Sequence, residues 1–89
     1  MSNRLNEWED FSARVGRHIE TYTVPQYGDS PGDPLSDFTD EEIIAQMKRY
    51  INRASSNVRG PAEAQRDMLK VAHYAGVLFT KRAERAVVQ

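Results

Sequence analysis

The sequence predicts an all-α protein, and three observations lead to that prediction. In three separate stretches, apolar residues recur at spacings of three and four, which is the pattern of helices with one buried face. No stretch alternates polar and apolar residues over the length of a strand. Three of the four prolines fall between the first two stretches, where they disfavour a helix or a central strand. We predict a three-helix domain with a long Pro/Gly/Asp-rich loop between helices 1 and 2.

Length and composition place this domain in a broad class. The chain has 89 residues, and we predict one domain over residues 1–89. A hydrophobic content of 39 % and a charged content of 28 % indicate a folded chain, and without cysteine no disulfide can form. The longest apolar run, VAHYAGVLF, is too short to span a bilayer, and the polar N-terminus is unlike a secretory signal. We therefore expect a cytoplasmic protein without a membrane partner.

The first helix is expected at about 4–23. Ser2 or Asn3 can cap its start, and Gly16 weakens its middle. It should stop near Thr23, because the residue before Pro25 is pushed out of the helical region. Its apolar stripe consists of Leu5, Trp8, Phe11, Val15, Ile19 and Tyr22.

The loop is expected over residues 24–38. It is longer than most connections in compact domains, so it is either functional or partly disordered. Apolar side chains within and beside it would tie it to the core, and we interpret it as a rigid acidic connector. These anchors are Tyr22, Val24, Tyr27, Leu35 and Phe38.

The second helix is expected at about 40–54, and its start has a distinctive signature. Thr39 and Glu42 have the spacing of a capping box, and Phe38 and Ile43 have that of a hydrophobic staple. The apolar face that follows comprises Ile43, Ile44, Met47, Tyr50, Ile51 and Ala54.

The third helix is expected at about 61–85, with Pro61 in its first turn. Gly76 would permit close approach of another helix. Asp67 is placed to pair with Lys70 and with an arginine across the helical hairpin. The expected buried stripe comprises Ala64, Met68, Val71, Ala72, Ala75, Leu78 and Phe79.

Charge is unevenly distributed along the chain. Residues 1–42 hold three basic and ten acidic side chains, a net of −7, whereas residues 43–89 hold nine basic and three acidic ones, a net of +6. This asymmetry suggests that the two halves attract each other, within one molecule or between subunits.

Few residues indicate catalysis. His18 and His73 lack a second ligand at helical spacing, and no phosphate loop or nucleophile motif is present, so we predict neither an enzyme activity nor a cofactor. One alternative is a magnesium-dependent enzyme, because carboxylate pairs on two helices could hold that ion. The pairs are Glu7 with Asp10 and Glu63 with Asp67. This arrangement resembles the all-α nucleotide pyrophosphatases, but the chain lacks their Glu-x-x-Glu helix.

The charged and aromatic residues of the second and third helices favour binding instead. Our first interpretation is a protein–protein interaction or regulatory module, with self-association as one form of it, because Arg and Tyr are frequent in binding hot spots. The expected partner-binding residues are Arg53, Arg59, His73, Tyr74, Tyr27 and Asp29. The alternative is a nucleic-acid-binding protein that uses the basic surface of these helices. Its expected contacts are Lys48, Arg49, Arg53, Lys81, Arg82 and Arg85.

Three segments also resemble a group of small uncharacterised phage and prophage proteins. These segments are VPQYGD, KRYINRASSN and RDMLKVAHYA, and the resemblance covers residues from about 21 to 79. It implies no defined activity and no catalytic residue. It does imply an origin in a bacterial or phage-infected cell.

Overall fold

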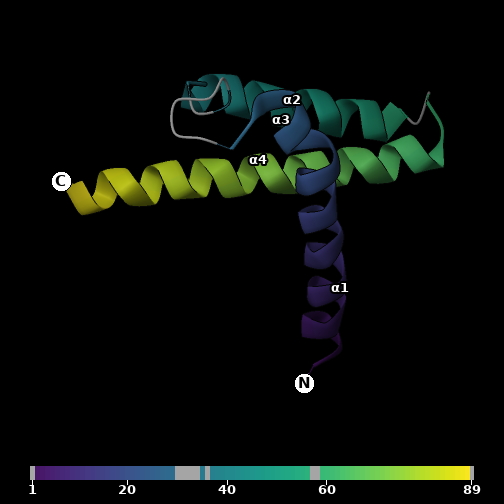
Figure 1. Ribbon diagram of the computed structural model, residues 1–89. Coiled ribbons are helices and arrows are strands. Elements are labelled where there is room, and N and C mark those ends of the chain that lie inside the picture. Colours follow the sequence, from purple (N-terminus) through teal and green to yellow (C-terminus); the bar gives the residue numbers. More distant parts are fainter. Residues whose placement is uncertain (1, 30–34, 36, 57–58, 89) are drawn as a thin grey trace. The chain divides into compact units, whose positions relative to one another are not determined.

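The computed structural model describes residues 2–29, 35, 37–56 and 59–88, and side chains as far as residue 83. Helices account for nearly all of these described residues and no strand occurs among them, so the predicted all-α class is confirmed (Figure 1). The chain divides into two compact units, residues 1–37 and residues 38–89, which we describe separately. None of the described helices combines the length and the apolar character that crossing a membrane requires.

In the first unit, three helical elements follow one another without interruption. Helix α1 spans Asn3–His18, the π-helix η1 spans Ile19–Thr23, and the short helix α2 spans Val24–Tyr27. Ser2 is the N-cap of α1, and its hydroxyl accepts the backbone N–H of Leu5 at 3.1 Å. The cap therefore lies at the first of the two expected positions.

The predicted end of the first helix near Thr23 is wrong. Val24 has helical dihedrals although it precedes Pro25, and the helical backbone continues to Tyr27. The reason is the wide turn before the proline: the Val24 N–H bonds to the Ile19 carbonyl, five residues earlier, and this pattern overrides the local preference. The chain leaves the helix at Gly28, whose φ of 85° favours glycine.

The predicted loop over residues 24–38 is accordingly not confirmed. Residues 24–27 are helical, and the interval between α2 and the next helix is 28–39. Residues 30–34 and 36, which include two of the prolines, lie outside the described residues.

The second unit is a helical hairpin of α3, which spans Asp40–Ser56, and α4, which spans Pro61–Val88. The two helices run antiparallel side by side (Figure 1). The capping box of α3 is confirmed, because Thr39 Oγ1 accepts the Glu42 N–H at 3.1 Å and a Glu42 carboxylate oxygen accepts the Thr39 N–H at 3.0 Å. Gly60, with φ of 94°, makes the turn into Pro61.

The core of the hairpin follows a narrower stripe of α4 than the sequence predicted. Ile43 is fully buried, and the rings of Tyr50 and Tyr74 stack with centroids 6.0 Å apart. Met68 and Phe79, both expected inside, are 38 % and 75 % exposed. At 100° per residue these two positions lie roughly 120–140° around α4 from Tyr74, which is too far to face α3.

The close helix approach expected at Gly76 is also absent from the described structure. A Cβ atom at this position would meet no described atom within 4 Å, and the residue is exposed.

Candidate functional sites on the helical hairpin

A buried ion pair joins the two helices of the hairpin. Arg53 on α3 donates two hydrogen bonds to Asp67 on α4, from Nε at 3.0 Å and from Nη2 at 2.5 Å. The Asp67 side chain is only 1 % exposed, and Lys70 Nζ lies 4.0 Å from one of its oxygens. Asp67 thus pairs with both residue types that the sequence predicted.

The ionisation of this pair follows from its geometry. The hydrogen bonds from Arg53 lower the pKa of Asp67 and outweigh the opposing effect of burial. The same contact raises the pKa of Arg53. Asp67 therefore remains charged at neutral pH although water barely reaches it.

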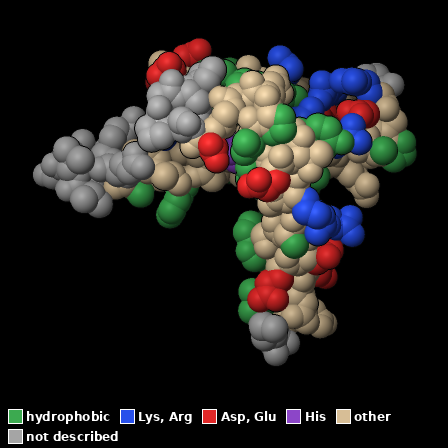
Figure 2. Space-filling model, in the orientation of Figure 1, with side chains coloured by type: hydrophobic (Ala, Val, Ile, Leu, Met, Phe, Trp, Pro, Cys, Tyr) green, Lys and Arg blue, Asp and Glu red, His purple; other side chains and the backbone are tan. Residues whose placement is uncertain are grey.

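Three cations surround the Tyr50 ring beside this pair. The Arg49 guanidinium lies 5.0 Å from the ring centroid, and the Arg53 guanidinium and Lys70 ammonium each lie 4.9 Å from it. We call Arg49, Arg53, Lys70 and Tyr50 the cation cluster. Blue side chains gather over this end of the hairpin, at the upper right of Figure 2. Cation–π attraction to one ring draws these charges together.

Negative charge does not balance the cation cluster. Asp67 is the carboxylate bound within it, and the nearby Glu63 is bonded to Arg66 at 2.7 Å. The pKa of Lys70 is lowered, first by burial and next by the charge of Arg53. The attraction of Asp67 and Glu63 does not offset these two effects.

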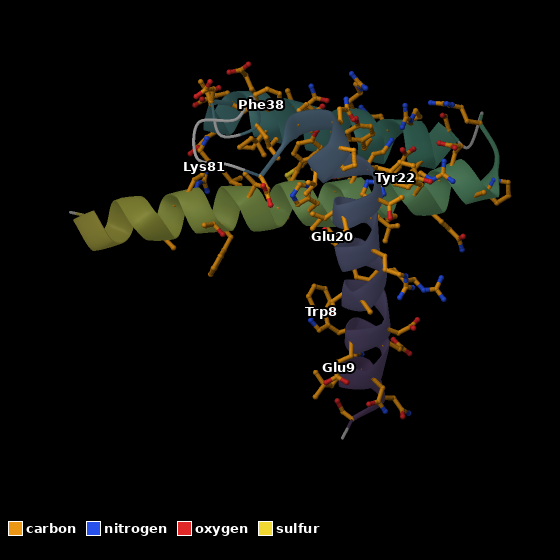
Figure 3. All side chains as sticks on the ribbon, viewed as in Figure 1. Trp8, Glu9, Glu20, Tyr22, Phe38 and Lys81 are labelled. Atoms are coloured by element: carbon orange, nitrogen blue, oxygen red, sulfur yellow. The ribbon has the colours of Figure 1, made fainter. Side chains whose placement is uncertain are left out.

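At the opposite end of the hairpin, two cations of α4 contact the residues at the start of α3. Lys81 Nζ donates a hydrogen bond to the backbone carbonyl of Phe38, and Arg82 Nε approaches Asp40 at 3.5 Å (Figure 3). Both contacts hold the chain at the start of α3. These two cations have a local structural role.

The six residues predicted to contact nucleic acid are not brought together. Arg49 and Arg53 lie in the cation cluster, whereas Lys81 and Arg82 lie beside Phe38 and Asp40, about 14 to 20 Å away along α3 by its rise per residue. Lys48 is exposed but is not a member of the cluster, and the Arg85 side chain lies outside the described residues.

The predicted partner-binding residues come from both units, and those of the hairpin differ in exposure. Tyr74 is 6 % exposed and packs against Tyr50, so it belongs to the core. Arg59 is exposed and His73 is half-buried, with its ring 5.9 Å from that of Tyr74. Tyr27 and Asp29 belong to the first unit.

The carboxylates proposed for magnesium are engaged by arginines. Asp67 is held by Arg53 and Glu63 by Arg66, while Asp10 lies 3.5 Å from Arg14. Glu7 is exposed on α1. Within the described parts of the chain, no group of three or more His, Asp or Glu side chains has a geometry that could hold a metal ion.

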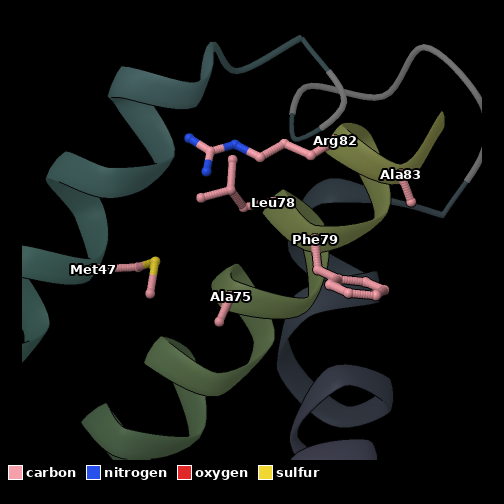
Figure 4. Close-up of a pocket in the computed structure, with 6 residues that line it drawn as sticks. All are labelled: Met47, Ala75, Leu78, Phe79, Arg82 and Ala83. Atoms are coloured by element: carbon pink, nitrogen blue, oxygen red, sulfur yellow. The ribbon is translucent and has the colours of Figure 1, made fainter. Parts of the chain in front are cut away.

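An apolar groove on the hairpin was not predicted from the sequence. It has a volume of about 480 Å³ and opens to solvent beside the exposed ring of Phe79 (Figure 4). Ala75, Phe79 and Ala83 follow one another at intervals of four and form one side of it. That spacing was visible in the sequence, but we assigned Phe79 to the core. The groove is lined by Met47, Ala75, Leu78, Phe79, Arg82 and Ala83.

Comparisons with known proteins add no relative: no family model matches the chain, and neither the curated proteins nor the solved structures contain a match.

Proposed function

We propose that this protein is an interaction module whose hairpin binds an acidic, amphipathic helix of a partner protein in the groove beside Phe79. The observation that carries the proposal is the exposure of Phe79, which is 75 % accessible at the edge of an apolar groove. A large aromatic side chain in that position loses favourable burial unless a partner covers it.

The volume and the apolar lining of the groove are compatible with a helical ligand. Its volume of about 480 Å³ falls within the usual range of binding pockets, and Met47, Leu78 and Phe79 supply an apolar lining. Helix-in-groove recognition places apolar anchors at positions i, i+3 or i+4, and i+7 into such a surface. Phe79 would then act as the hot spot of the interface.

The charge of the hairpin supports an acidic ligand. Residues 38–89 contain nine basic and six acidic side chains, a net of +3, and Arg82, whose Nε lies 3.5 Å from Asp40, also lines the groove. Opposite charges across an interface raise the association rate and select among partners. An acidic helix with one apolar face matches both properties.

Photo-crosslinking tests this proposal directly. Phe79 is replaced by benzoylphenylalanine, which is aromatic like Phe, and the protein is irradiated in a bacterial lysate. The resemblance to phage and prophage proteins suggests that source of partners. The matched control carries the same crosslinker at Arg59, which is exposed and does not line the groove. A partner crosslinked only from position 79 is identified, and its contacting segment is synthesised as a peptide.

The peptide supplies the quantitative readout. We expect an acidic amphipathic segment to bind the unmodified protein and to bind Phe79→Ala at least about tenfold more weakly, as expected for a hot spot. Equal affinity for the two proteins would disprove the proposed site. Crosslinking of position 79 to a second copy would instead identify the groove as a self-association surface.

A further inference from the structure

We propose that the cation cluster of Arg49, Arg53, Lys70 and Tyr50 binds a phosphate monoester dianion, such as inorganic phosphate or the phosphate of a nucleoside monophosphate. This inference does not rest on the proposed function, because none of these four residues lines the groove. It rests on the charge, the donors and the rigidity of the cluster.

The charge of the cluster matches a dianion. Three cations lie within 5.0 Å of one ring centroid, and Asp67 supplies one negative charge, which leaves an excess of +2. A phosphate monoester carries about −1.5 to −2 at neutral pH. A phosphodiester or a single carboxylate carries one negative charge per group and would leave part of the excess unmatched.

The cluster also retains hydrogen-bond donors for such a ligand. Arg53 uses Nε and Nη2 for Asp67, so Nη1 remains on the outer edge of the guanidinium, where no described residue accepts from it. Arg49 is exposed, and the hydrogen bond that it donates to the Tyr50 hydroxyl is long, at 3.5 Å. Planar guanidinium groups suit the oxygens of phosphate, and Lys70 adds a third cation.

Contacts in the core of the hairpin hold Arg53 and Tyr50 in place. Asp67 holds Arg53 through two hydrogen bonds, and Tyr74 stacks on Tyr50 with an interplanar angle of 13°. The Arg53 and Lys70 side chains are 21 % and 26 % exposed, so both reach solvent from a partly desolvated position. Preorganised charges of this kind bind an anion with little reorganisation.

A titration with inorganic phosphate at constant ionic strength tests the proposal, with chloride as the reference anion. Backbone and side-chain NMR signals report binding residue by residue. We expect saturable shifts at residues 49, 53 and 70, together with a rise in the pKa of Lys70, since a bound dianion favours its charged form. Arg49→Gln and Lys70→Gln should each weaken phosphate binding by at least about tenfold, the scale of one charge-assisted hydrogen bond. Lys48→Gln is the matched control and should change the affinity less than about twofold.

Two further probes distinguish binding of a phosphate dianion from binding of phosphodiester groups. Adenosine monophosphate should bind at the same residues as inorganic phosphate, because both carry the dianion. An oligonucleotide without a terminal phosphate, which has only diester groups, should bind more weakly than either. Tighter binding of that oligonucleotide would overturn the proposal in favour of a polyanion surface. Unchanged phosphate affinity in Arg49→Gln, or the lack of saturable shifts with inorganic phosphate, would also overturn it.

Discussion

The first helix and the hairpin share an amphipathic pattern but differ in what that pattern buries. In the hairpin, Ile43 is fully buried and Asp67 is 1 % exposed. On α1, by contrast, Leu5 is 41 % and Trp8 57 % exposed. A helix of the length of α1 is marginal in water without packing, so it depends on its own caps and side-chain pairs. Apolar periodicity therefore predicts that a helix forms, but it does not predict how deeply that helix is buried.

The two units should differ most in the loss of stability caused by Ile43→Ala in the hairpin and by Trp8→Ala on α1. Loss of the buried Ile43 side chain should lower the free energy of unfolding by about 2–5 kcal/mol, because it leaves a cavity. Loss of the exposed Trp8 should change it by less than about 0.5 kcal/mol. Urea unfolding followed by circular dichroism measures both values. Similar losses in the two variants would mean that Trp8 is buried in solution.

Asp67→Asn should cause the next largest loss in the free energy of unfolding. The amide keeps the shape of the side chain but loses the charge that binds Arg53, so we expect a loss of about 1.5–3 kcal/mol. Asp37→Asn, at an exposed position, serves as the control and should be nearly neutral.

The pH dependence of stability provides a second test of the Asp67 ion pair. The pKa of Asp67 is lowered in the folded protein, so between that value and the ordinary value near 3.8 the unfolded chain binds more protons. The contribution of Asp67 is therefore fully present above about pH 4 and is lost as the pH falls through its folded pKa. In Asp67→Asn this acid-dependent loss should be smaller. Identical acid unfolding curves would contradict the assignment.

Removing the N-cap side chains of Thr39 and Ser2 should lower stability by intermediate amounts, globally for Thr39 and locally for Ser2. Thr39→Ala removes the hydroxyl that accepts the Glu42 N–H, which is one of the two hydrogen bonds of the capping box, and should cost about 1 kcal/mol of global stability. Ser2→Ala should chiefly speed amide hydrogen exchange in the first turn of α1, because a helix end opens locally. Hydrogen exchange measured by mass spectrometry separates global from local opening. Equal global destabilisation by the two variants would show that α1 unfolds together with the hairpin.

The smallest expected effect is a gain in stability. Gly76 and Gly16 lie within helices, and a Cβ atom at either position would meet no described atom within 4 Å. Gly76→Ala should raise the free energy of unfolding by about 0.5–1 kcal/mol, because alanine favours the helix. Gly16→Ala should slow hydrogen exchange within α1 by a comparable local amount. A loss of stability in Gly76→Ala would show that another surface approaches α4 at this position.

Local signals predicted most of what the described helices show. The Thr39 and Glu42 pair predicted the start of α3, because a capping box depends on residues three positions apart. Asp67 was expected to pair with Lys70 and with an arginine across the hairpin, because residues three apart share one face of a helix. Which arginine it binds depends on the register of the two helices, which the sequence alone does not determine.

The sequence-based predictions were wrong where contacts between distant residues determine which of several local arrangements forms. Tyr74 and Phe79 are both aromatic residues of α4, and only the direction of α3 determines that the first is buried and the second exposed. The cation cluster likewise requires that Lys70 on α4 meet a ring of α3. At Pro25 the helix continues because of the five-residue turn before it, which no residue of the sequence indicates.

That turn at Ile19–Thr23 has a consequence for how the chain tolerates changes in length. A π-turn contains one residue more than the α-turn that it replaces. Deleting one residue from this segment would convert the wide turn into an ordinary α-turn ahead of Pro25, while the residues on either side would keep nearly the same angular positions around the helix. The wide turn thus lets this segment lose one residue without rotating the residues that lead to Gly28 relative to the α1 face that carries Trp8.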